Sequence, residues 1–358
     1  MRKKIMALAI VLSLLNFTAC TFSEGTNSRS GEITSSSGDI KTSQSETNSS
    51  EPFIAPNQNI TSAKRYKVDF QEVTEDQVTA LFKTNPQKES DDFGNTDFAV
   101  NDEKGALSLS RGIGGKNKYY SVSYHTKWGN DYDSVVYRSY GYKEADADMD
   151  WDFLSRTEAE QKISDILDEF MRTGVSVKAY AISRDTYSEL VNKKVEADKE
   201  WNKKLQEELG ITSEEKIWSD AADYYYFYIE QTVDGIPIQS ELIGNIDVGN
   251  QTWGPSGSAV LSADGLGYLR VHSPYKIVEE VETTEEFITF LEAEQMFKDK
   301  NDSFLITEEV MLDYSRLVYV VLRAENNDLI LTPAWEFKYN GEQFFRVNAY
   351  TGEEVVTV

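Results

Sequence analysis

The stretch YYYFYIEQTVDGIPI (224–238) decides the fold class of this chain. Its first six residues are all aromatic or β-branched, and such residues favour extended strands. Asp234-Gly235 is a typical type I′ turn pair, so the stretch predicts an antiparallel hairpin. Rings at even and odd positions point to opposite faces of a strand. We therefore expect this aromatic ladder to form sheet core rather than an exposed sugar-binding surface, and we expect the same of Trp335 and Phe337.

Helices surround this hairpin along the sequence. The segment LSRTEAEQKISDILDEFMRTG (154–174) begins with a capping box of Ser155 and Glu158, and Gly174 predicts its end. Its apolar residues recur at helical spacing, so one face should be buried. Three more helices are predicted, at 74–82 with Thr74 as N-cap, at 185–210 ending at Gly210, and at 283–300.

The remaining segments predict strands. Asn340-Gly341 is a second type I′ turn signal between two of them. The predicted strands are 64–70, 97–100, 105–111, 117–126, 133–142, 175–183, a hairpin over 258–282, 305–323, 328–339 and 343–350. This pattern predicts an α+β fold in which antiparallel sheets each pack against a helix.

The tetrapeptide EAEQ occurs at 158–161 and again at 292–295, each time within an amphipathic helix. Each copy is followed by a strand and then by an aromatic strand that ends in an x-Gly turn, at Gly235 and Gly341. The first copy is longer by about the length of the helix 185–210, which we interpret as an insertion. The shared order of elements predicts a structural duplication.

The C-terminal third is similar to a known family. The helix FITFLEAEQMF, the segment LTPAWEFKYNGEQFFRVNAYTGEEV and the hairpin 224–238 resemble the PepSY-like units of Firmicute surface lipoproteins, including YycI-type regulators of a sensor histidine kinase. The resemblance covers residues 220–358 and is strongest at Pro333-Ala334-Trp335, Asn348-Ala349-Tyr350-Thr351-Gly352 and Gly235-Ile236-Pro237. It implies two or more tandem units and a non-enzymatic protein. YycI-type regulators use a transmembrane helix to reach their kinase, whereas only a lipid anchor is expected here.

The first residues, MRKKIMALAIVLSLLNFTAC, predict a signal peptide over 1–19. The apolar run after the three cations is too short to span a bilayer, which needs about 20 residues. FTAC resembles a bacterial lipobox, which implies cleavage before Cys20 and a diacylglycerol (palmitate-bearing) thioether on its sulfur. An incidental cysteine in an ordinary secreted protein is the alternative. The single Cys stands at the one position that lipidation requires, so we expect anchoring to the bilayer at the outer face of a Gram-positive cytoplasmic membrane.

Composition divides the mature chain into a tether and a folded part. Residues 20–63 are rich in Ser, Thr, Asn and Gly, which predicts a disordered segment after the lipidated Cys. We expect an N-terminal α+β domain over 64–220 with the long charged helix, and a PepSY-like domain over 221–358.

The charge of the chain excludes several classes of partner. It has 36 Lys and Arg against 61 Asp and Glu, a formal net charge of −25. Such a chain repels nucleic-acid phosphates, so no nucleic acid is expected as a partner. Two His and one Cys also exclude a disulfide framework and a Cys-rich zinc site.

No catalytic motif emerges from the residue pattern. His125 and His272 lack a neighbouring nucleophile-elbow sequence, since GPSGS (254–258) is not G-x-S-x-G. Four alternating carboxylates offer oxygen ligands that suit Ca²⁺, although the EF-hand spacing fails. The alternative is an acidic loop before a helix N-terminus, where the dipole favours negative charge. These weak metal candidates are Asp146, Asp148, Asp150 and Asp152, and no other cofactor is expected.

These observations predict a non-enzymatic surface lipoprotein that regulates or senses through protein contacts, with a membrane kinase, a protease or another envelope protein as partner. The apolar seam of the helix 185–210 either packs on its own sheet or docks a partner, and we expect packing. A solute- or glycan-binding lipoprotein is the alternative, which an aromatic platform would favour. A hydrolase with an acidic dyad is a third hypothesis.

Overall fold

The aromatic stretch forms the hairpin that its sequence predicts. Strand β7 (Tyr224–Val233) turns through Asp234 and Gly235, whose φ angles of 52° and 76° are those of a type I′ turn, into β8 (Ile236–Pro237). Tyr224, Tyr225, Tyr226 and Phe227 are all buried. Both faces of β7 are therefore covered, as expected.

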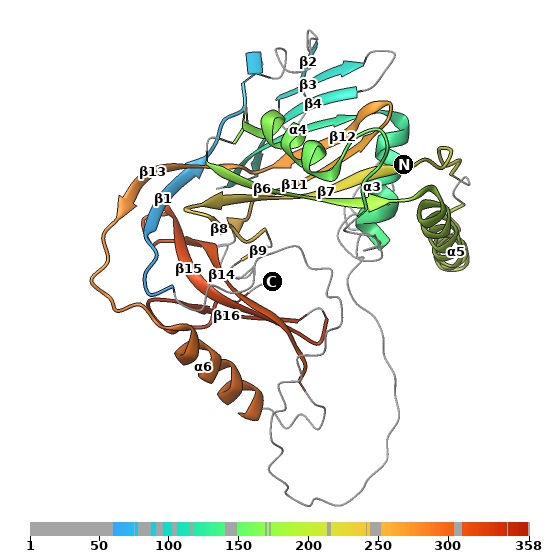
Figure 1. Cartoon of the computed structure of the whole chain (residues 1–358). Coiled ribbons are helices and arrows are strands. Elements are labelled where there is room, and N and C mark those ends of the chain that lie inside the picture. The colour runs from blue at the N-terminus through green and yellow to red at the C-terminus, as the bar shows by residue number, and fades with distance from the viewer. Residues whose placement is uncertain are drawn as a thin grey trace, which may run out of the picture. The chain divides into compact units, whose positions relative to one another are not determined.

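The computed structural model describes residues 60–74, 76–77, 87–90, 96–101, 106–114, 117–139, 149–168, 170–171, 173–212, 216–240, 242–243, 252–303, 310–341 and 343–356. Within these ranges the fold is α+β with two main antiparallel sheets (Figure 1). The expected signal peptide, Cys20, the tether up to residue 59 and most of the helix expected at 74–82 lie outside them. The start of that last segment is described, and Thr74 and Gln77 bond each other as in a capping box.

The larger sheet has nine strands and contains β7. Its order is β2-β3-β4-β5-β12-β11-β7-β6, and β8 pairs with β7. The other members are β2 (Gln87–Ser90), β3 (Thr96–Asn101), β4 (Ala106–Gly114), β5 (Asn117–His125), β6 (Gly174–Ile182), β11 (Ser256–Ser262) and β12 (Gly265–His272).

The smaller sheet has five strands. Its order is β13-β1-β15-β14, and β16 pairs with β15 beyond the end of β1. Its members are β1 (Arg65–Phe70), β13 (Tyr275–Val281), β14 (Leu312–Arg323), β15 (Leu329–Tyr339) and β16 (Gln343–Asn348). Two short strands, β9 (Leu242–Ile243) and β10 (Thr252–Trp253), pair with each other.

The sheets do not follow the domain boundary expected between residues 220 and 221. Strands β7, β11 and β12 come after that boundary but pair in the same sheet as β2–β6, whereas β1 pairs with strands of the C-terminal half. A strand needs a hydrogen-bonding neighbour in space rather than in sequence, and the two halves interleave to supply one. The division into 64–220 and 221–358 is thus not the division of the sheets.

Helices cover both faces of the nine-stranded sheet. Helix α4 (Arg156–Asp168) packs its buried Ala159, Ile163 and Leu167 on the face that carries Tyr225 and Phe227. Helices α3 (Lys127–Ser139) and α5 (Arg184–Leu209) lie on the other face. In the smaller sheet, α6 (Phe290–Ser303) packs against the face that carries the fully buried Trp335 and Phe337.

The two EAEQ copies have the same local geometry. Glu158 accepts hydrogen bonds from Ser155, and Glu292 accepts them from Thr289, so each helix begins with a capping box. Gln161 and Gln295 each donate to the aspartate four residues on, at 2.7 Å in both helices. The alanine of each copy is completely buried.

The pairing that follows each copy is also the same. After α4, β6 pairs with β7, and β7 turns into β8; after α6, β14 pairs with β15, and β15 turns into β16. Both turns hold positive φ, at Asp234-Gly235 and Asn340-Gly341. Helix α5 stands between β6 and β7, where the second copy has a short turn, so its place fits the expected insertion.

Some predicted elements and element bounds are wrong. Residues 133–142 were expected as a strand, but α3 runs to Ser139, because Tyr132, Val135 and Val136 form a helical stripe buried against the sheet. Gly174 begins β6 instead of ending α4, whose last residue is Asp168. Helix α6 begins at Phe290, after the capping Thr289, and not at 283.

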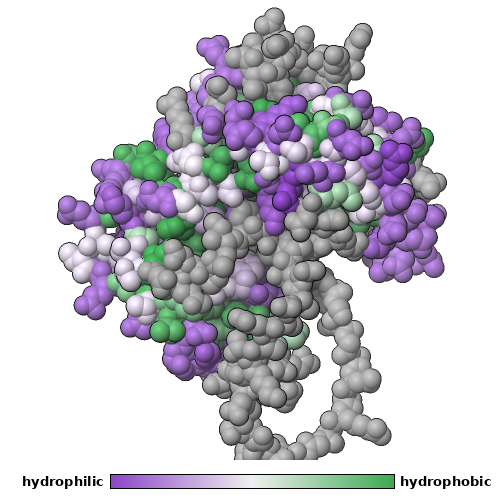
Figure 2. All heavy atoms as spheres, viewed as in Figure 1, coloured by the Kyte–Doolittle hydropathy of each residue, from purple (hydrophilic) through white to green (hydrophobic). Residues whose placement is uncertain are grey.

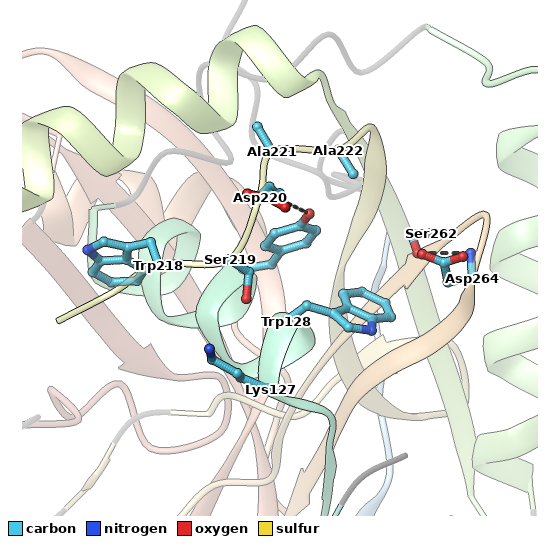
Figure 3. Close-up of a pocket in the computed structure, with 10 residues that line it drawn as sticks. Lys127, Trp128, Trp218, Ser219, Asp220, Ala221, Ala222, Ser262 and Asp264 are labelled. Carbon is cyan, nitrogen blue, oxygen red and sulfur yellow. Dashed lines mark hydrogen bonds between the residues drawn. The ribbon is translucent and has the colours of Figure 1, made fainter. Parts of the chain in front are cut away.

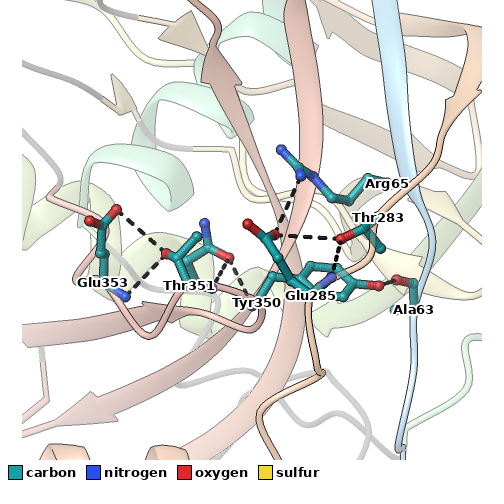
Figure 4. Close-up of polar contacts among 8 residues, drawn as sticks. Ala63, Arg65, Thr283, Glu285, Tyr350, Thr351 and Glu353 are labelled. Carbon is teal, nitrogen blue, oxygen red and sulfur yellow. Dashed lines mark hydrogen bonds and ion pairs between the residues drawn. The ribbon is translucent and has the colours of Figure 1, made fainter.

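Polar contacts join the two ends of the described chain. The Tyr350 hydroxyl donates to the Ala63 carbonyl just before β1, and Arg65 forms an ion pair with Glu285 at 3.8 Å (Figure 4). Tyr350 itself lies in the turn after β16, where its amide donates to Asn348 Oδ1 at 2.9 Å. The C-terminal turn therefore fixes the entry of the chain into β1.

None of the helices in the described ranges is long and apolar enough to cross a bilayer.

Candidate functional site

A pocket of about 500 Å³ opens on the α3 side of the nine-stranded sheet. Three segments form it: the start of α3, the segment 216–223 that leads into β7, and the β11–β12 turn (Figure 3). Ten residues line it, and six of them supply its chemistry: Lys127, Trp128, Tyr132, Trp218, Asp220 and Asp264.

The start of α3 is fixed against strand β12. The Thr126 hydroxyl caps the helix by accepting from the Gly129 amide at 3.0 Å, and the Thr126 amide donates to the Gly267 carbonyl at 2.8 Å. A Cβ on Gly129 would lie 1.9 Å from that carbonyl oxygen, and one on Gly267 would lie 2.1 Å from the Trp128 ring. The two glycines thus allow the helix and the indole to lie directly on the strand.

Tyr132 forms the floor of the pocket. It is 2% exposed, and its ring stacks on Tyr224 at 4.5 Å between centroids and meets Trp128 edge-on at 5.5 Å. Its hydroxyl donates to the Asp220 carbonyl at 2.7 Å. The floor is therefore joined both to the sheet core and to the pocket wall.

The wall is held by one buried carboxylate, that of Asp131 on α3. Asp131 accepts from the Ser219 hydroxyl at 2.8 Å and the Ser219 amide at 3.1 Å, and it pairs with Lys216 Nζ at 2.7 Å. The same Lys216 ammonium lies 3.9 Å from the centroid of the Trp218 ring. Because Asp131 is only 3% exposed, these contacts organise the wall before any ligand arrives.

Carboxylates outnumber cations among the residues that line the pocket. Asp220 and Asp264 are exposed at its rim, and Lys127 is the one cation among the ten lining residues. Burial, followed by the charges of Asp220 and Asp264, raises the pKa of Tyr132 to about 12. The negative charges of the two aspartates therefore reach the Tyr132 hydroxyl at the floor of the pocket.

The predicted metal residues do not form a metal site in the described ranges. Asp146 and Asp148 lie outside them. Asp150 accepts from the Arg156 amide at 2.7 Å, and Asp152 is exposed. No group of three or more His, Cys, Asp or Glu side chains among the described residues could hold a metal ion. The role of Asp150 is the alternative stated above, an acidic residue at the start of a helix.

The two histidines are strand residues. His125 ends β5, and His272 ends β12, opposite Ser121 of β5 and Ser256 of β11. Burial, and then the charge of Arg270, lowers the pKa of His272 to about 4. His272 is therefore neutral in the folded protein at physiological pH.

Sequence reasoning missed every residue of the pocket. The wrongly predicted strand at 133–142 placed Trp128 in a connecting loop, and the sequence between Gly210 and residue 222 predicts only a short acidic helix or loop. One signal was available: Trp128 and Trp218 stand in polar surroundings, KWGND and IWSDA, where no core strand would use them. Large aromatic residues in such segments point to a surface site.

Comparisons with known proteins support the fold alone. No family model and no curated protein sequence matches the chain. Among solved structures, the chain is similar to an uncharacterized protein from Eubacterium rectale, with 16% sequence identity and a TM-score of 0.57. The match covers 84% of this chain and 86% of that one.

Proposed function

We propose that this chain is a non-enzymatic binding protein of the cell surface that holds a solute or glycan in the pocket beside α3. The observation behind the proposal is the juxtaposition of Trp128, Trp218 and Tyr132 with the exposed carboxylates of Asp220 and Asp264. Aromatic rings cover flat apolar faces of a ligand, and a few polar groups fix its orientation.

Preorganisation of the pocket supports a binding role. The floor is buried in the sheet core, and Asp131 already holds the wall, so binding requires little ordering of side chains. A site formed in advance loses less entropy when a ligand enters it.

The cell-surface location is proposed from the sequence, through lipidation of Cys20. Metabolic labelling with palmitate should label the wild-type chain in its native host and should fail to label Cys20→Ala. Wild-type protein recovered wholly from the medium would contradict the anchor.

Calorimetric titration of the full-length chain tests the pocket. A panel of neutral saccharides, amino sugars and small amines should contain at least one ligand, and Trp218→Ala should weaken its binding at least tenfold. Trp201→Ala is the matched control, because Trp201 lies on α5, is 47% exposed and does not line the pocket. Absence of binding at millimolar ligand, or equal binding by both variants, would refute the function.

A second proposed function, regulation through protein contacts, is favoured by α5. This helix has 26 residues, about 39 Å at 1.5 Å per residue, but its buried residues are Tyr187 and Leu190 near its start. Trp201 and Leu209 are 47% and 55% exposed on the distal half. Figure 2 shows mostly hydrophilic residues over α5, at the right of the view.

Crosslinking in intact cells tests this second function. A photoreactive residue at position 201 should capture a membrane kinase, a protease or another envelope protein, whereas one at the exposed Lys276 of β13 should not. Equal capture from both positions would argue against a docking role for α5.

A further inference from the structure

The charged groups of the pocket restrict the chemistry of its ligand. Two carboxylates, those of Asp220 and Asp264, are exposed at the rim, against one ammonium, that of Lys127. The three hydroxyl groups among the lining residues already bond protein groups: Tyr132 donates to the Asp220 carbonyl, Ser219 donates to Asp131, and Ser262 accepts from the Asp264 amide at 3.1 Å. The exposed charged groups among the lining residues are therefore mainly anionic.

The pocket wall already binds one ammonium group. Lys216 Nζ lies 3.9 Å from the Trp218 ring centroid and 2.7 Å from Asp131 Oδ1. An indole face and a carboxylate thus stabilise a cation together at this wall. The same pair of chemical groups recurs inside the pocket, where the indoles of Trp128 and Trp218 line the same cavity as Asp220 and Asp264.

Aromatic rings attract cations by their quadrupole, and indole does so most strongly. Nearby carboxylates add a Coulomb attraction that a neutral ligand does not experience. The chain as a whole has a formal net charge of −25, so its field also favours the approach of cations and repels anions.

From this juxtaposition we infer that the pocket binds an organic ammonium group, on a small amine or on an amino sugar. The ammonium lies against one of the two indoles, that of Trp128 or that of Trp218, and the carboxylates of Asp220 and Asp264 attract it. The inference rests on the proposed binding function and names the ligand class of the same pocket.

The decisive comparison uses two probes of the same shape that differ in charge. Choline and 3,3-dimethyl-1-butanol are titrated separately into the full-length chain and followed by calorimetry. Choline should bind about tenfold more tightly, the size of a partly desolvated cation–π contact with a carboxylate nearby. Glucosamine and glucose form a second pair, which separates amino sugars from simple amines as the source of the ammonium.

Variants of the rim test the assignment of charge. The double variant Asp220→Asn, Asp264→Asn should reduce the preference for choline to about twofold, and its thermal midpoint should match that of wild type because both side chains are exposed. Lys127→Gln should strengthen choline binding. Equal affinity for choline and its neutral analogue in wild type, or an unchanged preference in the double variant, would overturn the inference.

The outcomes separate this inference from the proposed function. If glucose binds as well as glucosamine and Trp218→Ala abolishes both, the pocket is a binding site and only the ammonium assignment fails. If neither charged nor neutral probes bind at millimolar concentration, both proposals fail together.

Discussion

At the scale of single residues, Asp131 has the most consequential contacts near the pocket. Its carboxylate joins α3 to Lys216 and Ser219 of the wall, and it is almost completely buried. Neither the residue type nor its neighbours in the sequence indicated this role, because the partners are 88 positions away in the case of Ser219. Because α3 was not predicted as a helix, no sequence pattern distinguishes Asp131 from an aspartate exposed to solvent.

Replacement of Asp131 by Ala should make the pocket wall, residues 216–223, more mobile. The part-buried amide and hydroxyl of Ser219 lose their acceptor, so the free energy of unfolding should fall by about 1–3 kcal/mol. Urea denaturation measures that loss, and hydrogen exchange should accelerate at residues 218–222. Asp131→Asn is the control, since an amide oxygen still accepts from Ser219. Unchanged exchange in Asp131→Ala would mean that other contacts hold the wall.

His272 should make stability depend on pH. Its pKa is about 4 in the folded chain and about 6.5 when unfolded. Between these values the unfolded chain binds more protons, so acidification from pH 6.5 to pH 4 removes stability, by up to about 3 kcal/mol. His272→Gln should flatten this part of the profile in denaturant titrations across pH. A variant whose slope from pH 4 to 6.5 equals that of wild type would contradict the assignment.

At the scale of elements, local signals identified the helices that have complete caps. Ser155 and Glu158 marked α4, and Gly210, in the left-handed conformation at φ 67°, marked the end of α5. Helix α3 was not predicted from the sequence, because Val135-Val136 and the aromatic residues near them favour strands locally. Its helical form depends on burial against β11 and β12, which is tertiary information that the local pattern lacks.

The two capping boxes provide a matched pair of predictions. Ser155→Ala and Thr289→Ala should each lower the free energy of unfolding by about 1 kcal/mol, because each removes the side chain that satisfies an orphan helix amide. Chemical denaturation measures both. Similar losses are expected because the two helix starts have the same hydrogen bonds. A loss in only one variant would show that the two capping boxes contribute differently to stability despite their common geometry.

At the scale of the whole molecule, hydrogen bonds and ion pairs connect the two sheets. The Gln231 side chain on β7 bonds both the amide and the carbonyl of Tyr275 at the start of β13. Arg316 on β14 pairs with Glu230 on β7 at 3.3 Å and with Glu336 on β15 at 2.8 Å. Burial opposes the charge of Glu336, but Arg316 and Arg346 hold its pKa at about 2.

Removal of the Glu336 charge should lower the free energy of unfolding, because the network around it connects the two sheets. Glu336→Gln takes the shared carboxylate from the buried Arg346 and from Arg316, which keeps Glu230 at 3.3 Å, so we expect a loss of about 3–5 kcal/mol in urea denaturation. Glu280→Gln is the matched control, because it breaks an exposed ion pair with Lys64 and should cost at most about 1 kcal/mol. Equal losses in the two variants would show that the buried network contributes no more to stability than an exposed ion pair.

The pairing of the strands shows where prediction from the sequence ends. Most strands and both hairpin turns were identified from local pattern, and the α+β class is correct. The order of strands within each sheet was not predicted. Strand β1, for example, pairs with residues more than 200 positions away, as in the pair of Val68 and Leu329. The pocket depends on the same long-range arrangement, since its three segments meet only after the sheet has formed.

The position of β1 also has a kinetic consequence. Tyr319 bonds the carbonyl of Lys64 across 255 residues, so β1 meets its partners only when nearly all of the described chain is present. The first strand of the described residues therefore pairs late, with strands near the end of the chain. A topology rich in such distant contacts folds slowly, and the exposed edges of unfinished sheets would need protection from aggregation during that delay.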